Sequence, residues 1–434
     1  MTPPPGRLRW SIVAMLVGFS LVSYIERMNI SVAAKFMEPD LGLTPVEMGR
    51  VFSAFVLGYA ALQIPVGMLA DRFGPARMFG TIVWLWAALT VATGWLPGLW
   101  GGAGGALVTL MAVRFLLGLS VAGVYPLCAR TVANWMPTPE RAFAYSFVIA
   151  GVSLGSSVTP PVMAWLMTTL GWREAIYISA IPAVLIGLVW MRYGADSPRT
   201  HPRVSAAERD YILAGQSVDA ATPATAATWL AILRTPSLLL LSVSYFFIGN
   251  VLYVYIFWFF RYLIDERQFS VLGSGFVTSL PFVAAFILSP IGGAVCDRLT
   301  ERFGKRTGRR TTAMVGVLIA ASCLVIGVRT EHPYLAVATL SLAFGFQMFA
   351  ESAYWSSAMD IANRATGAAT GLMNTVNNLG GVVSTALTPI VIQHYGWTTA
   401  FNLCAGVSVV AALLWLGIKA DLPLAEARGE ARAR

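Results

Sequence analysis

The chain has 434 residues and a formal net charge of +9, and 57% of its residues are hydrophobic while only 12% are charged. The charged share is roughly half that of an ordinary soluble domain, too little to cover a water-soluble fold of this length. The composition therefore excludes a soluble globular protein and indicates a membrane protein.

Long apolar runs follow one another along the whole chain. A bilayer core about 30 Å thick needs ~20 consecutive apolar residues in a helix. Lipid offers backbone N–H and C=O groups no partners, so these runs predict helices, and the short alternating segments of a β-barrel are missing. The twelve expected spans are residues 10–33, 49–70, 78–96, 107–132, 143–168, 173–193, 237–262, 273–296, 311–328, 334–357, 367–393 and 398–418.

The basic residues predict how these spans are oriented. With the N-terminus in the cytoplasm, cytoplasmic segments hold 22 of the 30 Lys and Arg residues and the outer side holds five. This asymmetry is typical of an inner or plasma membrane protein with both termini cytoplasmic. The positive charge thus reflects topology, and we expect no nucleic acid partner.

An internal repeat divides the chain into two halves. At an offset of 226, Gly67, Asp71 and Arg72 fall on Gly293, Asp297 and Arg298, and at 225 Gly171-Trp172 falls on Gly396-Trp397. We expect a first six-helix bundle over 1–193, an exposed cytoplasmic linker over 194–236, and a second bundle with a tail over 237–434. Parallel repeats of this kind are typical of secondary transporters, whose substrate site lies between the halves near the bilayer midplane.

Several motifs resemble a known family. The segment from Gly67 to Arg77, with Asp71-Arg72, resembles the loop signature of the major facilitator superfamily. Tyr24-Ile-Glu26-Arg27-Met-Asn29 looks like the first helix of the anion:cation symporter family. So do Arg114-Phe-Leu-Leu-Gly118, Tyr125-Pro126, Arg130, Trp135 and Asn374-Thr-Val-Asn377-Asn378-Leu-Gly380-Gly381. The resemblance implies an all-α membrane protein with twelve transmembrane helices in two pseudo-symmetric six-helix bundles.

Members of that family include carriers of sugar acids, tartrate and phthalate. The sequence departs from the family pattern in two places: Glu26 stands where Asp is usual, and Val121 stands where Glu is usual. The resemblance implies that the missing Glu helps to bind the driving proton. The identity of the coupling ion is therefore open.

Two arginines lie inside expected spans, where ionisable groups are expensive and usually functional. Arg27 and Arg114 are each about six or seven residues from the outer end of their span, roughly 10 Å deep at ~1.5 Å per residue. Together they could clamp a carboxylate, or they could simply be neutralised by Glu26 and water. Glu26 is the expected proton acceptor, and the alternative for it is a structural salt bridge.

Other polar residues in or beside the spans have open interpretations. Arg261 could extend to the outer surface from the seventh span. Glu351, near the cytoplasmic end of the tenth span, is interfacial or replaces the carboxylate missing at 121. Asp71 and Asp297, with Arg72 and Arg298, open cytoplasmic loops after helix ends and are expected to lock the inward gate.

Neutral polar side chains would complete a binding site. Their hydroxyl and amide groups suit carboxylate or sugar oxygens, and the alternative for each is a packing or interfacial role. These side chains are Tyr24, Tyr59, Tyr253, Asn374, Asn377 and Asn378. The motif Gly151-x-x-x-Gly155 predicts close helix packing and nothing more.

The sequence predicts a transporter and not an enzyme. It has no GxxxxGK[ST] motif, so ATP does not drive it directly, and no metal-ligand spacing. We expect a monomer without cofactor that takes up a small organic anion, such as a sugar acid, with protons by alternating access. The alternatives are proton-antiport efflux, against which the fifth span lacks a GPxxGG-like run, and a membrane sensor, for which no signalling domain is appended.

Overall fold

The computed structural model describes residues 6–99, 102–199, 201–214, 226–362 and 365–422, without the side chains of 64, 66–72, 142, 226 and 227. This part of the chain contains sixteen α-helices and two short 3-10 helices, and no strand. The helices are α1 (Leu8–Leu41), α2 (Pro45–Phe73), α3 (Pro75–Trp95), η1 (Leu96–Gly98), α4 (Ala103–Val121), α5 (Val124–Trp135), η2 (Thr138–Glu140), α6 (Arg141–Leu170), α7 (Trp172–Ser179), α8 (Ile181–Tyr193), α9 (Ala206–Ala214), α10 (Ala226–Leu233), α11 (Pro236–Phe257), α12 (Phe259–Asp265), α13 (Val271–Thr278), α14 (Leu280–Arg329), α15 (Pro333–Ala362) and α16 (Thr366–Leu414).

The helices carry apolar side chains on their outer surface as well as inside. Nine helical stretches of the described residues are long and apolar enough to cross a membrane. Large side chains face outward along them, for example Val108, Met191 and Phe276, each more than 60% exposed. Such a surface is stable only in contact with lipid, as expected for a multi-pass membrane protein.

The helices differ in detail from the expected spans. The first span was expected to end at residue 33, but α1 continues to Leu41. Lys35 and Glu38 can lie within this helix because they form ion pairs with Asp265 and Arg261. The fourth, sixth and seventh expected spans each consist of two consecutive helices, namely α4 with α5, α7 with α8, and α11 with α12.

The number of spans stays a prediction. The nine stretches do not include α2, and two of them, ending at Arg329 and at Leu414, are each interrupted by one non-helical glycine. These glycines, Gly304 and Gly396, lie between the eighth and ninth and between the eleventh and twelfth expected spans. Gly304 and Gly396 therefore lie where the chain would have to turn between two successive spans.

Left-handed backbone positions repeat along the chain with the offsets of the sequence repeat. Gly42 (φ 66°) and Gln268 (φ 58°) are 226 residues apart, and Gly171 (φ 98°) and Gly396 (φ 77°) are 225 apart. Only glycine adopts positive φ freely, so Gln268 is an uncommon residue at its position. The repeat thus extends from residue identity to the backbone at corresponding turns.

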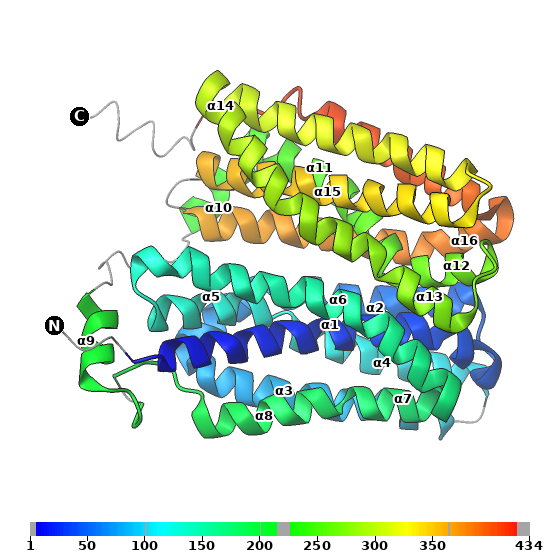
Figure 1. Cartoon of the computed structure of the whole chain (residues 1–434), viewed down its shortest axis with the longest axis horizontal. Helices are drawn as coiled ribbons and strands as arrows, with labels where there is room; N and C mark the ends of the chain where they lie inside the picture. The colour runs from blue at the N-terminus through cyan, green and yellow to red at the C-terminus, as the bar shows by residue number, and fades with distance from the viewer. Residues whose placement is uncertain (1–5, 100–101, 200, 215–225, 363–364, 423–434) are drawn as a thin grey trace.

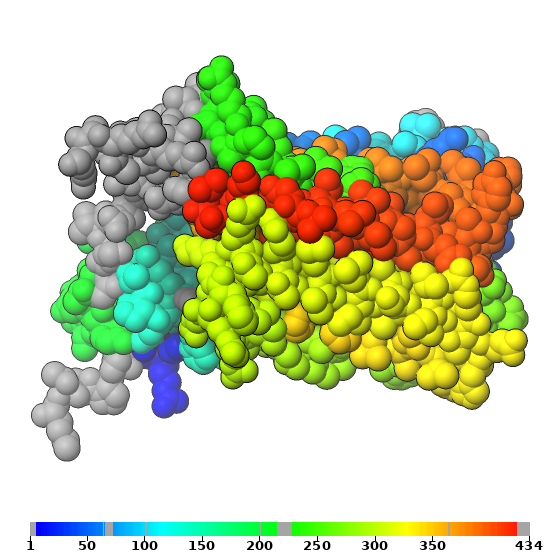
Figure 2. Space-filling view, turned by 90° about the horizontal axis from the view of Figure 1, so that it is seen from above, coloured from blue at the N-terminus to red at the C-terminus, as the bar shows by residue number. Residues whose placement is uncertain are grey.

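The helices pack as two groups, seen below and above in Figure 1. The first half, α1–α8, is held by contacts such as α1 with α6 and α2 with α4, and the second half, α10–α16, by α14 with α15 and α11 with α16. Figure 2 shows α14 in yellow beside the orange and red α16 along one face of the second half. Placing the domain boundaries at residues 193 and 237 remains a proposal.

Glycines set the shortest distances between helices. A Cβ at Gly151 would lie 2.8 Å from the Val17 carbonyl oxygen, and one at Gly155 would lie 2.7 Å from that of Leu21. The expected packing motif therefore joins α6 to α1. Gly380, which matches Gly155 in the repeat, plays the same part between α16 and α11.

The linker packs more tightly than an exposed tether. Glu208 of α9 is buried and accepts hydrogen bonds from the backbone N–H groups of Leu8 (3.3 Å) and Arg9 (3.0 Å) at the start of α1. A carboxylate at a helix N-terminus satisfies free N–H groups and suits the helix dipole. His201 also packs its ring against Trp135, so the linker is attached to this end of the first half.

We expect Gly396→Ala to lower the midpoint of thermal unfolding, because alanine at φ 77°, ψ 172° costs about 1–3 kcal/mol. No heavy atom of the described residues lies within 4 Å of the added Cβ, so the loss would come from the backbone alone. Gly406→Ala is the matched control, since its Cβ is equally free and its backbone helical. A thermal-shift measurement on purified protein in detergent compares the two, and equal midpoints would contradict the expectation.

Candidate functional site

Arg27 lies among aromatic rings of the first half, and Tyr253 of the second half is close enough to interact with its charge, so it lies where the two halves meet. Its Cζ is 4.5 Å from the ring centroid of Tyr59, 4.9 Å from that of Tyr24 and 5.7 Å from that of Phe55. The side chain is nearly buried, and its Nε has no hydrogen-bond partner among the described residues. A guanidinium held only by π faces keeps its N–H donors available for an anion.

The second half contributes neutral polar groups at this interface. Tyr253 of α11 donates a hydrogen bond to Asn378 Oδ1 of α16 (2.6 Å), and Asn378 Nδ2 donates to Gln63 Oε1 of α2 (2.9 Å). This chain of bonds crosses from one half to the other. Two expected residues of the second half, Tyr253 and Asn378, are therefore connected to the first half through Gln63, which the sequence reasoning missed.

Glu26 and Arg114 lie inside the first half. Glu26 is fully buried, and its Oε2 accepts hydrogen bonds from the Thr90 hydroxyl of α3 and from Asn29 Nδ2 (3.5 Å). Arg114 of α4, also fully buried, donates to Asn29 Oδ1 (3.3 Å) and to the Glu26 backbone oxygen (3.0 Å). Adjacent residues on a helix are about 100° apart, so Glu26 points into the bundle while Arg27 points to the interface.

The two guanidiniums approach a single aromatic ring. The Phe55 centroid is 5.7 Å from Arg27 Cζ and 5.2 Å from Arg114 Cζ. The expected pair of arginines is thus brought together around Phe55. Their contacts differ, since Arg114 donates hydrogen bonds to α1 of its own half, whereas Arg27 contacts aromatic faces.

The remaining expected residues of the second half serve its internal packing in this structure. Asn377 Nδ2 donates to the Tyr245 backbone oxygen (2.8 Å), and the backbone oxygen of Asn374 accepts from Asn378 Nδ2 (2.7 Å). Glu351 accepts hydrogen bonds from the Tyr245 hydroxyl (2.6 Å) and from Trp355 Nε1 (3.2 Å). Glu351 therefore belongs to a half-buried aromatic cluster of α11 and α15.

Arg261 does not extend to the surface as expected. It forms ion pairs with Glu38 of α1 and with Asp265 (2.8 Å), and Asp265 also pairs with Lys35 of α1 (2.5 Å). The side chains of Arg261 and Glu38 are 16% and 10% exposed, so the pairs are largely protected from water. We name Lys35, Glu38, Arg261 and Asp265 the interhalf latch, which lies at the end opposite α9 in Figure 1.

Other contacts between the halves lie in the same stretch. Phe52 of α2 stacks on Phe257 of α11 with centroids 4.7 Å apart, and the hydroxyls of Ser53 and Thr385 are 2.8 Å apart. In the described residues, the halves are thus tied together at the latch end and around the midplane.

The expected gating residues lie within helices and not after their ends. The backbone of Asp71 and Arg72 belongs to α2, and their side chains lie outside the described residues. Asp297 and Arg298 are exposed residues of α14, which stays helical until Gly304. Asp297 pairs with Arg309, which lies beyond this glycine (3.3 Å). Helical hydrogen bonding continues through these charged residues until a glycine with positive φ breaks it.

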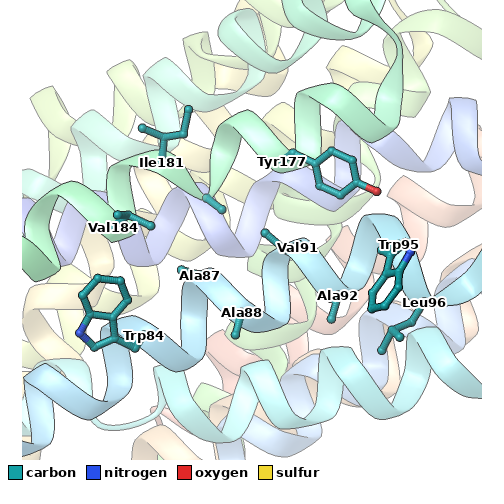
Figure 3. A pocket seen from close by; sticks show the side chains of 11 residues that line it. Trp84, Ala87, Ala88, Val91, Ala92, Trp95, Leu96, Tyr177, Ile181 and Val184 are labelled. Atoms are coloured by element: carbon teal, nitrogen blue, oxygen red, sulfur yellow. The ribbon is translucent and has the colours of Figure 1, made fainter.

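A pocket of about 650 Å³ lies away from these residues, between α3, α7 and α8 (Figure 3). Its lining is apolar apart from the Tyr177 hydroxyl and the Trp84 and Trp95 ring nitrogens, and it contains none of the expected binding residues. The lining consists of Trp84, Ala87, Ala88, Val91, Ala92, Trp95, Leu96, Tyr177, Ala180, Ile181 and Val184. Since Trp84 and Trp95 are exposed on the outside of the bundle, the pocket opens toward lipid and does not suit an anion.

The described residues contain no candidate metal site. No group of three His, Cys, Asp or Glu side chains there could hold a metal ion, and the four cysteines are free. At this site, three buried atoms of ionisable side chains have no hydrogen-bond partner among the described residues: Glu26 Oε1, Arg27 Nε and Arg114 Nε. The arrangement can bind an anion and hold a proton.

Comparison with known proteins places these observations in a family context. The sequence matches the Major Facilitator Superfamily over residues 16–385 and 300–433. It is 34% identical to the probable sulfoacetate transporter SauU of Cupriavidus necator, over 96% of this chain and 94% of that protein. It is 31% identical to the probable galactarate/D-glucarate transporter GudP of Bacillus subtilis, over 95% of this chain and 92% of that protein.

Solved structures agree on the fold. A bacterial homologue of the human lysosomal transporter Spinster, in an inward-facing and occupied conformation, has a TM-score of 0.77 at 17% identity, covering 95% of this chain and 97% of its own. The D-xylose-proton symporter has a TM-score of 0.70 at 18% identity, covering 96% and 98%. The expected all-α membrane fold and the narrower resemblance to anion:cation symporters are confirmed, while the count of twelve spans stays a prediction. The relatives are named transporters and not enzymes.

We expect the interhalf latch to resist separation of the halves at its end. Glu38→Gln removes one charge of the Arg261 pair and should speed maleimide labelling of Ser53→Cys about fivefold, since ion pairs of this kind contribute ~1 kcal/mol. The measurement uses a variant without native cysteines.

Two further variants make the latch experiment specific. The variant that inverts all four latch charges (Lys35→Glu, Glu38→Arg, Arg261→Glu and Asp265→Lys) should return labelling toward the starting rate, because every pair again joins opposite charges. Asp40→Asn breaks a pair with Arg173 that stays within the first half, so it should leave the rate unchanged. Fast labelling of the charge-inverted variant, or an equal effect of Asp40→Asn, would contradict the latch.

Proposed function

This chain belongs to the Major Facilitator Superfamily, and we propose that it carries a small organic anion across the membrane together with protons, by alternating access. The named substrates of its relatives, sulfoacetate and galactarate or D-glucarate, are small anions and support this substrate class. A sugar acid or another small carboxylate or sulfonate fits the proposal.

The observation that carries the proposal is the position of Arg27. It is a nearly buried cation at the meeting of the halves, surrounded by aromatic faces and left with an unpaired Nε donor. An uncompensated charge in such a place is costly unless an anion joins it. We propose that the anion binds between Arg27 and the hydroxyls of Tyr24, Tyr59 and Tyr253, with Asn378 completing the site.

Glu26 is the proposed proton site. It is a fully buried carboxylate of the first half, and Val121 is an apolar residue where the resemblance to the anion:cation symporter family implies a second carboxylate. Glu351 has hydrogen-bond donors as partners and lies in the second half, which makes it a second candidate. The proton can then enter and leave without a direct contact with the substrate.

Alternating access would move the two halves relative to each other around this site. The latch end is tied by ion pairs in this structure, so we propose that substrate exchanges from the end that carries α9. We further propose that this end faces the cytoplasm, from the distribution of basic residues. Asp71, Arg72, Asp297 and Arg298 are then candidates for the gate at that end.

We expect Arg27→Ala to weaken anion binding at least 30-fold, since removing one partner of a buried charge pair costs about 2–5 kcal/mol. Arg27→Lys should recover little, because an ammonium does not offer the planar fork of donors. Calorimetric titration with sulfoacetate and D-glucarate, chosen from the relatives, measures both variants.

Arg114→Ala distinguishes two roles for the second arginine in the same titration. A comparable loss of affinity supports a clamp of two guanidiniums. An affinity within threefold of the starting protein contradicts the clamp and leaves Arg27 as the binding arginine. Wild-type affinity in Arg27→Ala would overturn the proposed site.

We expect Glu26→Gln to abolish proton-driven accumulation of labelled substrate in proteoliposomes while counterflow exchange survives. Glutamine keeps the shape and hydrogen-bonding capacity of the side chain but cannot release a proton. Exchange requires no net proton movement, so its survival shows that the variant is folded and binds substrate. Accumulation by Glu26→Gln under a proton gradient would remove Glu26 as the coupling site and favour Glu351 or another ion.

A further inference from the structure

Asn29 lies between the two buried charges of the first half. Its Nδ2 donates to Glu26 Oε2 (3.5 Å) and to the Ser179 hydroxyl of α7 (3.1 Å), while its Oδ1 accepts from Arg114 Nη1 (3.3 Å). Residues three apart share one face of a helix, so Asn29 stands one turn above Glu26. One amide thus contacts the carboxylate with its donor side and the guanidinium with its acceptor side.

The two charges do not pair directly. Arg114 donates to the backbone oxygen of Glu26 (3.0 Å) and to Asn29, and the carboxylate is bound by Asn29 and Thr90 instead. Within the described residues, no donor bonds to Glu26 Oε1 and no acceptor bonds to Arg114 Nε. Opposite charges this close, each with an unused atom, would form an ion pair if nothing separated them.

We propose that Asn29 is a positioning residue that keeps Arg114 from pairing with Glu26, and that Thr90 holds the carboxylate in the separated arrangement. The inference rests on the proposed role of Glu26 in proton coupling. A carboxylate locked in a buried ion pair stays ionised and cannot exchange its proton. The amide provides polar contacts to both groups without fixing the charge of either.

The surroundings of Glu26 allow this role. The groups facing it are Thr90 from α3, Arg114 from α4 and Asn29 from its own helix, with Ser179 of α7 behind the amide. Arg114 is the charged group among them, because Arg27 points to the interface between the halves. Asn29 thus acts as a spacer between the two charges. Its removal has one main consequence, a direct contact between Glu26 and Arg114.

The test follows the infrared band of the protonated carboxyl group that disappears in Glu26→Gln, titrated with pH in purified protein. Thr90→Val removes a donor to the ionised carboxylate, so the band's midpoint should move about one pH unit higher. Asn29→Ala should move it about one unit lower, because the new charged partner outweighs the lost amide donor. Opposite shifts from two residues that both donate to Glu26 are specific to the spacer role.

The controls separate this inference from the proposed function. Thr93→Val lies one turn along α3, and its hydroxyl bonds only to the Leu89 backbone oxygen, so it should leave the midpoint unchanged. Arg114→Gln in the Asn29→Ala background should reverse the acidic shift. An unchanged or higher midpoint in Asn29→Ala overturns the spacer role, even where Glu26→Gln abolishes coupling. A coupled Glu26→Gln transporter overturns the proposed function instead.

If Asn29→Ala does not fold, Asn29→Ser also leaves the space between Glu26 and Arg114 open and gives the same expected sign. Its midpoint decides the question by the same criterion. The band needs no substrate, so the result does not depend on which anion the protein carries.

Discussion

The cost of burying ionised side chains in an apolar bundle governs the first half of this protein. Glu26, Arg27 and Arg114 are almost or completely removed from solvent, and each must find its stabilisation within the protein. Arg27 finds aromatic faces, whereas Glu26 and Arg114 find the hydroxyl of Thr90 and the amide of Asn29. These contacts join α1 to α2, α3 and α4, so the charges that are expensive to bury also fix the arrangement of the helices.

The two halves share a backbone plan but differ in chemistry. Turns with positive φ recur at Gly42 and Gln268 and at Gly171 and Gly396, and close packing recurs at Gly155 and Gly380. Charges gather inside the first half, while the second half presents phenol and amide groups such as Tyr253 and Asn378 to the interface. The same backbone arrangement therefore holds charged groups in the first half and neutral hydrogen-bonding groups in the second half.

The sequence predicts the properties that depend on local composition. Apolar runs long enough to cross a bilayer and the glycine spacing on α6 reappear in the structure, because each depends on residues close in the chain. The offset of the repeat reappears because the same local patterns occur in both halves. The partners of charged groups depend on distant residues and could not be read in this way. Arg261 with Glu38, Glu208 with the start of α1, and Glu26 with Thr90 are separated by 223, 199 or more, and 64 residues. One sequence signal could have predicted the latch. Lys35 and Glu38 follow the first apolar run at helical spacing, and charged residues on a helix that extends beyond the lipid need charged partners.

The latch and the linker place different bonds at the two ends of the molecule. At the latch end, four partly buried charges from α1 and α12 neutralise one another across the halves. At the other end, Glu208 and Glu140 bind Arg9, all within the first half and its linker.

A carrier that alternates must break its closing contacts repeatedly, so no single closing contact between the halves can be very strong. Ion pairs with 10–37% side-chain exposure meet this requirement, because water can replace each partner as the pair opens. The fully buried charges of the first half could not be separated so easily. Their contacts stay inside one half, so movement of the two halves need not break them.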